Sequence, residues 1–293
     1  MTSTISGPVA FQGAPGANSD LACREVFPGI PTLPCTAFED VFAAVREGRA
    51  ERAMIPIENS LNGRVADIHH LLPGGGLKIV GEHFHPVHHC LMSVPGATVY
   101  SVREALSHTQ ALGQTRETLR KLGIAPVNFY DTAGAAQEVA KRGDPTLAAV
   151  ASALAAEIYG LEILMSNIED ASHNTTRFLI MARRAIKLPA DCPVAVTGFA
   201  FEVRNIPAAL YKVLGGFATN GVNMTKLESY MVGGSFTATQ FYAEVEGRLD
   251  DPAMGRAFDE LRFFARSVSV LGTFPGDPAR RGNEPLNQPA SMA

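Results

Sequence analysis

The feature that most constrains the fold is an alternation of short apolar strands with amphipathic helices through the first 165 residues. Residues 38–47 carry apolar side chains at helical spacing, and residues 53–57 follow as a short buried strand. Asp131 is a typical N-cap for a helix over residues 132–142, and residues 147–150 are again a strand. Strands that alternate with helices predict an α/β domain with a mainly parallel sheet.

The alternation stops at residues 183–193, which contain two prolines and are predicted to form a linker. The chain that follows, over residues 194–274, reads as strand, helix, two strands joined by a hairpin, helix and strand. This βαββαβ order is that of the ferredoxin-like unit. The tail over residues 275–293 is polar and rich in proline and glycine, and we expect it to be disordered.

Two local signals mark predicted helix starts. Residues 12–19 form a glycine-rich turn in which Asn18 or Ser19 is a plausible N-cap, and such a turn either holds a small anion or is simply tight. Ser101 and Glu104 fit a capping box, which predicts a short helix after residue 101.

Composition excludes several classes of partner. The chain has 293 residues, 46% of them hydrophobic, and a net charge of −4, which argues against nucleic acid and acidic membranes. The first residues show no secretory signal and no apolar run is long enough to span a bilayer, so we expect a cytoplasmic protein. Because the cysteines lack metal or redox spacing, we expect reduced thiols at Cys23, Cys35, Cys90 and Cys192.

Three polar groups interrupt the apolar pattern. They are the runs Glu58-Asn59-Ser60, Ser107-His108-Thr109-Gln110 and Asn174-Thr175-Thr176-Arg177, each next to an apolar strand. Such side chains are poor core material but can bind and orient a small molecule. Ligands bind at the carboxyl ends of strands in open α/β sheets. A two-lobed fold with a cleft between its lobes would bring the three groups together.

A cluster of histidines offers a metal-site alternative. It comprises His83, His85, His88 and His89 with Cys90. In a strand His88 and His89 point to opposite faces, and Glu82 is the one carboxylate nearby in sequence. We therefore favour ordinary strand histidines and predict no metal.

The polar runs, together with Ile55-Pro56-Ile57 before the first and Phe178 after the last, resemble prephenate dehydratase over nearly the whole chain. Residues 209–212 and 223–229 resemble an ACT domain fused to that enzyme. The resemblance implies decarboxylative dehydration of prephenate to phenylpyruvate in phenylalanine biosynthesis, with no metal or organic cofactor. It also implies a periplasmic-binding-protein-like catalytic domain, oligomerisation as a dimer or tetramer, and feedback control by L-phenylalanine.

The expected domain bounds follow from that resemblance. The catalytic domain covers residues 1–183, with one lobe over about 1–80 plus 164–183 and the other over about 81–163. The ACT domain covers residues 194–274.

Carried over by motif, the implied catalytic residues are Thr176, Glu58, Asn59 and Gln110. The implied substrate-binding residues are Ser60, Ser107, His108, Asn174, Thr175, Arg177 and Phe178. A threonine hydroxyl is a very weak acid, so Thr176 would donate a hydrogen bond or relay a proton. Glu58, if buried and protonated, is the alternative acid, with Arg177 holding a substrate carboxylate or orienting Glu58.

The implied phenylalanine site consists of Ile206, Pro207, Ala208, Ala209, Leu210, Asn223, Met224, Thr225, Lys226, Glu228 and Ser229 at a dimer interface. Family members that bind phenylalanine commonly read Arg-Pro after Glu-Ser, whereas this chain reads Tyr230-Met231. Its helix entry also begins with Pro207 rather than glycine.

Two other functions fit the same residues. One is a dehydratase of the same fold acting on arogenate, which carries an amino group where prephenate carries a keto group. The other is a non-catalytic amino-acid sensor, which would have no need of a proton donor. The sequence leaves open the substrate preference, the proton donor and the oligomer size.

Overall fold

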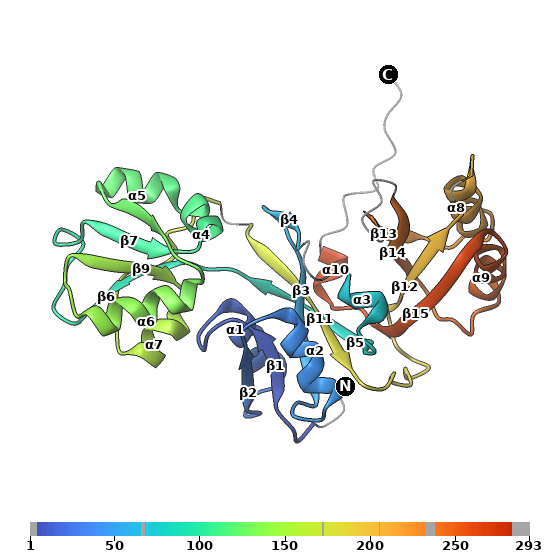
Figure 1. Ribbon diagram of the computed structural model, residues 1–293, viewed down its shortest axis with the longest axis horizontal. Coiled ribbons are helices and arrows are strands. Elements are labelled where there is room, and N and C mark those ends of the chain that lie inside the picture. The colour runs from blue at the N-terminus through green and yellow to red at the C-terminus, as the bar shows by residue number, and fades with distance from the viewer. Residues whose placement is uncertain are drawn as a thin grey trace. The chain divides into compact units, whose positions relative to one another are not determined.

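The computed structural model describes residues 5–65, 68, 70–171, 173–204, 206–231 and 238–282 (Figure 1). The chain forms two compact units. The first contains residues 1–68 and 85–183, and the second contains residues 69–84 and 184–293. None of the helices in the described ranges is long and apolar enough to cross a bilayer.

The first sheet is built around β3 (Arg52–Asn59) and has the order β2-β1-β3-β11-β5. Its other strands are β1 (Val9–Gln12), β2 (Thr32–Cys35), β5 (Lys78–Pro86) and β11 (Thr175–Ala182), with the short β4 (Gly63–Arg64) paired to β3. β1 runs parallel to both β2 and β3, whereas β11 is antiparallel to β3. The helices α1 (Asn18–Val26) and α2 (Phe38–Arg46) pack on it.

The second sheet of the first unit has the order β10-β6-β9-β7-β8. Its strands are β6 (Cys90–Ser93), β7 (Glu104–Ser107), β8 (Ala125–Asn128), β9 (Leu147–Ala151) and β10 (Glu162–Met165). Its helices are α4 (Thr109–Gln114), α5 (Arg116–Leu122), α6 (Thr132–Arg142) and α7 (Ala153–Tyr159). A separate apolar core that includes Leu91, Leu112, Leu119 and Val150 stabilises this lobe.

The predicted α/β fold is confirmed, but the expectation of a mainly parallel sheet is wrong, because each sheet of the first unit combines parallel with antiparallel pairs. The connections between the two sheets fall at residues 87–89 and 166–174, because β5 continues to Pro86 and β10 ends at Met165. The predicted helix after Ser101 is wrong. Ser101 closes a turn with Thr98, and the amides of Arg103 and Glu104 donate to the carbonyl of Thr146 as the chain enters β7.

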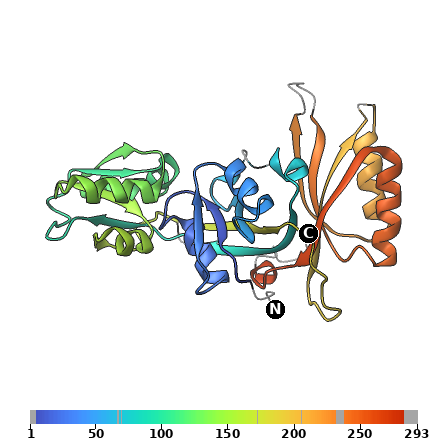
Figure 2. The ribbon, with the colours of Figure 1, turned by 60° about the horizontal axis from the view of Figure 1, so that its bottom comes forward.

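The second unit contains the predicted order of elements, β12 (Ala195–Val203), α8 (Ala209–Thr219), β13 (Met224–Met231), β14 (Ala238–Glu246), α9 (Pro252–Phe264) and β15 (Ala265–Pro275). The sheet order is β13-β14-β12-β15, and the paired strands are antiparallel. Figure 2 shows α8 and α9 together on one face of this sheet. Phe199, Phe217 and Phe258 stack in the core between the helices and the sheet. The predicted hairpin turn at residues 233–235 lies outside the described residues.

The segment 69–84 also packs in this unit, where α3 (Leu71–Gly74) contacts β12 and β15. Lys78 Nζ donates to the carbonyl of Val270 at 2.8 Å. Gly272 permits the close approach, because a Cβ there would overlap the backbone of Ile79. The predicted first lobe, which ended at about residue 80, thus differs from the observed division.

The expectation of disorder from residue 275 onward is wrong for residues 275–282. β15 runs to Pro275, and α10 (Ala279–Gly282) follows. Arg280 pairs with Glu82 and, at 2.8 Å, with Glu244, and both carboxylate side chains are completely buried. Two buried carboxylates need a cation, and this requirement orders the segment. Residues 283–293 lie outside the described residues.

Candidate active site

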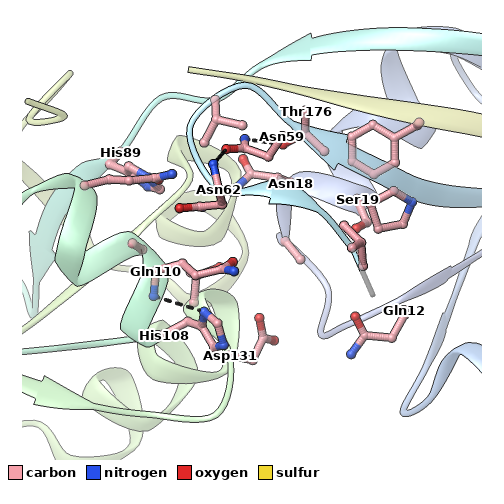
Figure 3. Close-up of a pocket in the computed structure, with 18 of the residues that line it drawn as sticks. Gln12, Asn18, Ser19, Asn59, Asn62, His89, His108, Gln110, Asp131 and Thr176 are labelled. Carbon is pink, nitrogen blue, oxygen red and sulfur yellow. Dashed lines mark hydrogen bonds between the residues drawn. The ribbon is translucent and has the colours of Figure 1, made fainter. Parts of the chain in front are cut away.

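A cavity of about 610 Å³ lies within the first unit and is lined by residues of both of its lobes (Figure 3). Its lining includes residues of β1, α1, β3 and β11 from the first lobe and of α4 and α6 from the second. The predicted site residues that line it are Asn59, His108, Gln110, Thr176 and Phe178. The predicted residues Glu58, Ser60, Ser107, Asn174, Thr175 and Arg177 are not among the lining residues.

The pairing of β3 with β11 explains this separation. Thr176 lies opposite Asn59, and Arg177 lies opposite Glu58. Neighbouring side chains of a strand point to opposite faces of the sheet, so Glu58 and Arg177 lie on the face opposite to Asn59 and Thr176. The register of the pair shifts next to them, between Arg177 and Phe178, and beyond the shift Pro56 and Phe178 line the cavity as well. Arg177 Nη1 donates to Glu58 Oε1 at 2.8 Å, with the arginine side chain only 5% exposed. The structure therefore does not place Glu58 where it could protonate a ligand in the cavity.

Asn59 is the centre of a hydrogen-bond network. The backbone amides of Leu61 and Asn62 both donate to its Oδ1 at 3.0 Å, which fixes which end of the side-chain amide is oxygen. Its Nδ2 consequently donates, to Asn174 Oδ1 at 2.8 Å and to Thr176 Oγ1 at 3.0 Å. The Thr176 hydroxyl oxygen thus receives a hydrogen bond, and its own proton is left to be donated into the cavity.

The network continues into the second lobe. Asn174 Nδ2 donates to Gln114 Oε1 at 2.9 Å, and the same oxygen lies 2.8 Å from His89 Nε2. A carbonyl oxygen only accepts, so His89 Nε2 carries a proton. Burial lowers the pKa of His89, which favours the neutral ring, and its Nδ1 has no hydrogen-bond partner among the described residues.

Gln114 and His89 were not predicted as site residues. Gln114 follows Gln110 by one helical turn on α4, so the spacing alone could have indicated it. The sequence favours an ordinary histidine over a metal ligand at position 89, and it does not indicate the hydrogen-bond partner Gln114, which lies 25 residues away.

The second lobe contributes two capped helix starts to the cavity. His108 Nδ1 accepts a hydrogen bond from the Gln110 amide at 3.3 Å and so caps α4. Asp131 caps α6 as predicted, its Oδ2 accepting from the Gly134 amide at 3.3 Å. Caps of this kind hold the side chains of a helix start in fixed positions.

The glycine-rich turn at residues 13–17 joins the two lobes. The Ala14 amide donates to Asp131 Oδ2 at 3.1 Å, and the carbonyls of Pro15 and Gly16 accept from Tyr159 and Ser152. Gly16 has a φ of 88° and packs directly on α7, where a Cβ would meet Ala155 Cα at 2.8 Å.

The predicted cap of the helix that follows this turn is wrong. Ala17 is the N-cap of α1, and no side chain caps that helix. Asn18 and Ser19 instead line the cavity.

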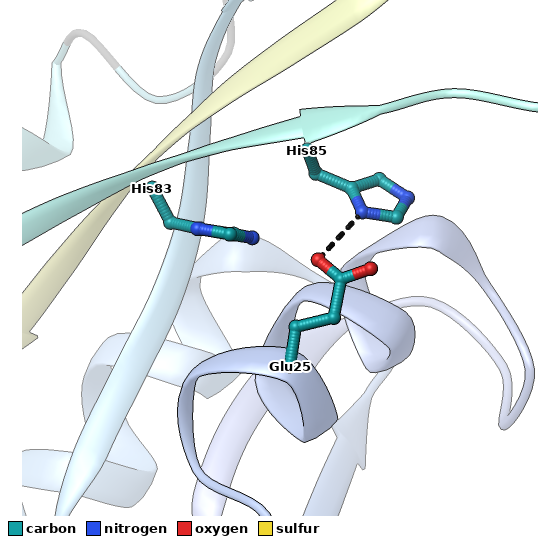
Figure 4. A group of neighbouring side chains, drawn as sticks. All are labelled: Glu25, His83 and His85. Atoms are coloured by element: carbon teal, nitrogen blue, oxygen red, sulfur yellow. Dashed lines mark hydrogen bonds and ion pairs between the residues drawn. The ribbon is translucent and has the colours of Figure 1, made fainter. Parts of the chain in front are cut away.

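The predicted strand histidines have carboxylate partners that the sequence did not indicate. His85 Nδ1 lies 2.9 Å from Glu25 Oε2, away from the cavity lining (Figure 4). His88 Nδ1 lies 2.8 Å from Glu169 Oε1. Burial raises the pKa of Glu169, but hydrogen bonds from His88 and the His89 amide outweigh it and leave that pKa lowered. Both carboxylates are distant from the histidines in sequence. The expectation that His88 and His89 lie in a strand is wrong, because they belong to the connection between β5 and β6.

The family model for prephenate dehydratase matches residues 9–186. The chain therefore belongs to the prephenate dehydratase family. A "bifunctional N-acyl-homoserine lactone acylase/prephenate dehydratase" of Komagataeibacter europaeus is 56% identical over 273 residues, which cover 93% of this chain and 97% of the relative. "Arogenate dehydratase/prephenate dehydratase 1, chloroplastic" of Arabidopsis thaliana is 38% identical, over 93% of this chain and 73% of the relative.

Solved structures of the family extend the likeness to the fold. Prephenate dehydratase from Arthrobacter aurescens, in complex with L-Phe, has a TM-score of 0.83 at 26% identity, covering 91% of this chain and 89% of the other. A structure described as GqqA, a quorum quenching acylase, has a TM-score of 0.88 at 55% identity, covering 94% of this chain and all of the other.

Proposed function

We propose that the protein catalyses the decarboxylative dehydration of prephenate to phenylpyruvate, carbon dioxide and water. The observation that carries the proposal is the Thr176 hydroxyl, which lines the cavity and accepts a hydrogen bond from Asn59. Membership of the family supports it as well.

In this reaction the bond between the ring and its carboxylate breaks, and the electron pair moves into the ring. The ring hydroxyl leaves with its own bonding pair and takes up a proton from solvent, directly or relayed through the Thr176 hydroxyl, to become water, so the ring becomes aromatic. Thr176 donates a hydrogen bond to the leaving oxygen as charge develops on it. Assistance of this kind typically contributes about 10²–10⁴-fold to a rate.

Helix starts provide the remaining polarity for an anionic substrate. The start of α1 has no side-chain cap, and Asn18 and Ser19 beside it line the cavity. The amides of a first turn and the helix dipole favour a carboxylate, and the buried Asp20 of this turn, which accepts from the Gly16 amide, already places one there. Arg64 lines the cavity too and adds a positive charge. Phe178 supplies an apolar surface for the ring.

The test is release of phenylpyruvate from prephenate, followed by ultraviolet absorbance. Thr176→Val removes the donor while keeping the side-chain shape, and we expect kcat to fall about 10²–10⁴-fold. Thr175→Val is the matched control, because that neighbouring side chain is not among the cavity-lining residues and should change kcat only a few-fold. A Thr176→Val enzyme as active as the control would refute the proposal.

An acylase activity stands in the name of the Komagataeibacter relative and in that of the GqqA structure. Nucleophilic acyl transfer uses a hydroxyl or thiol that is hydrogen-bonded to a base. Among the described residues that line the cavity, no Ser or Thr hydroxyl is hydrogen-bonded to His89 or His108.

We further propose that the second unit is an ACT domain that binds L-phenylalanine between two copies of the chain. Its strand order and the complex of the Arthrobacter relative with L-Phe support this. Ile206 is 55% exposed, and α8 begins at Ala209 rather than at Pro207, with Ala208 at a φ of 63°. In β13, Lys226 and Glu228 pair at 3.3 Å.

Calorimetry tests the effector site. L-Phenylalanine should give saturable heat and D-phenylalanine none, because an amino-acid site distinguishes the two by the positions of the ammonium and carboxylate groups. Sedimentation should show a dimer or a tetramer. Absence of heat with L-phenylalanine would contradict the effector site without affecting the proposed reaction.

A further inference from the structure

The cavity contains an unexpected negative charge. Among the described residues that line it, Asp131 is the one carboxylate and Arg64 the one arginine or lysine. Figure 3 shows Asp131 beside His108 and Gln110, across the cavity from Asn59 and Thr176. A carboxylate in the site of a dianion opposes binding, since like charges repel strongly in a partly buried site.

The hydrogen bonds that Asp131 makes within the protein do not require a charged side chain. Its Oδ2 accepts both the Gly134 amide at 3.3 Å and the Ala14 amide at 3.1 Å. Asparagine caps helices as well as aspartate does and would supply one oxygen for both bonds. Within the described part of the chain, Oδ1 of Asp131 accepts no hydrogen bond that would compete with a ligand.

The proposed reaction has two possible substrates that differ at one group. Prephenate has a keto oxygen on its side chain, and arogenate has an ammonium at the same carbon. The keto oxygen accepts hydrogen bonds and gains nothing from a carboxylate. The ammonium donates three hydrogen bonds and cancels the carboxylate charge.

We propose that Asp131 binds the α-ammonium of an amino-acid substrate, so that the protein dehydrates arogenate as well as prephenate. This rests on the proposed dehydration, in which the leaving hydroxyl lies at Thr176. The ring hydroxyl and the side chain are at opposite ends of the substrate, as Thr176 and Asp131 are on opposite sides of the cavity (Figure 3). Asp131 is thus a specificity-determining residue and takes no part in the bond changes.

The experiment compares kcat/KM for the two substrates in the wild type and in Asp131→Asn. The variant keeps both amide contacts and removes the charge. We expect the ratio of arogenate to prephenate kcat/KM to fall about tenfold to a hundredfold, the range for a hydrogen bond between charged groups. The fall should come mainly from a higher KM for arogenate.

Asp170→Asn is the matched control. Asp170 accepts the amides of Glu117 and Thr118 at the start of α5, in the same lobe, and is not among the cavity-lining residues. The Asp170→Asn substitution should leave the ratio of arogenate to prephenate kcat/KM unchanged. An unchanged ratio in Asp131→Asn, an equal change in both variants, or a wild type that turns over prephenate but not arogenate would overturn the inference. A wild type that dehydrates neither substrate would instead refute the proposed function.

Discussion

The substitution Asn59→Asp should reverse the direction of the Thr176 hydroxyl without changing the shape of the site. One oxygen of the new carboxylate can still accept the amides of Leu61 and Asn62. The other replaces an NH₂ group that donates to Asn174 Oδ1 and Thr176 Oγ1. Thr176 would then donate its proton to this carboxylate and have none for the leaving oxygen.

The magnitude follows from the interactions that are lost. Asn59 Nδ2 donates to three acceptors, Asn174 Oδ1, Thr176 Oγ1 and the Thr175 carbonyl. At about 1 kcal/mol each, the variant should lose about 2–3 kcal/mol of its free energy of unfolding. The loss of leaving-group assistance should lower kcat about 10²–10⁴-fold, or about 3–5 kcal/mol in the barrier. Both substitutions remove the same hydrogen bond, from the Thr176 hydroxyl to the leaving oxygen. The kcat of the double variant Asn59→Asp, Thr176→Val should therefore be little lower than that of either single variant.

The pH profile provides a second measurement on the same variant. A protonated carboxyl can donate again, and an ordinary aspartate has a pKa of about 3.9, which the facing Asn174 oxygen would raise. The kcat of Asn59→Asp relative to wild type should therefore rise as the pH falls toward that value. The reasoning is refuted if the variant keeps kcat within about threefold of wild type, or if the two substitutions multiply fully.

Three further predictions concern the network and the second unit. Gln114→Leu removes the acceptor of Asn174 Nδ2 and His89 Nε2. Denaturant titration should show that the free energy of unfolding falls by about 2–4 kcal/mol. His89 has a lowered pKa, so the stability that it contributes is present above its unfolded value near 6.5 and is lost as the pH falls through the folded value; His89→Gln should flatten the stability profile there. Arg280→Met removes a cation that pairs with the buried Glu82 and Glu244, and thermal unfolding should show that the free energy of unfolding falls by about 3–5 kcal/mol. Arg262→Met, at an exposed ion pair, should lower it by less than about 1 kcal/mol.

The sequence predicted most elements because their signals are local. Asp131 is an N-cap and the helix after it is amphipathic, and both are observed. The capping box at Ser101 and Glu104 failed because the segment gains more as strand β7 between β8 and β9 than as an isolated helical turn. The ordered residues 275–282 could not be predicted, since Arg280 is fixed by Glu82, which lies 198 residues earlier.

The position of Glu58 differs from the expected one for a related reason. Treating the strand as ending at residue 57 leaves Glu58, Asn59 and Ser60 in one loop, where all three can face the same ligand. β3 instead continues to Asn59, because Thr176 of β11 pairs with it. Strand alternation then separates Glu58 from Asn59, and this depends on a partner more than a hundred positions away.

The loss of Glu58 from the cavity face changes what the reaction requires of the protein. Aromatisation of the ring provides the driving force, so the leaving oxygen needs a well-placed hydrogen bond more than a strong acid. The network from His89 through Gln114, Asn174 and Asn59 orients the Thr176 hydroxyl, because each hydrogen bond in it determines which atom donates in the next. Preorganised donors of this kind stabilise a developing charge without reorganising during the reaction. In the proposed reaction, catalysis would depend on the orientation of the Thr176 hydroxyl, while the ion pair of Glu58 with Arg177 joins β3 and β11.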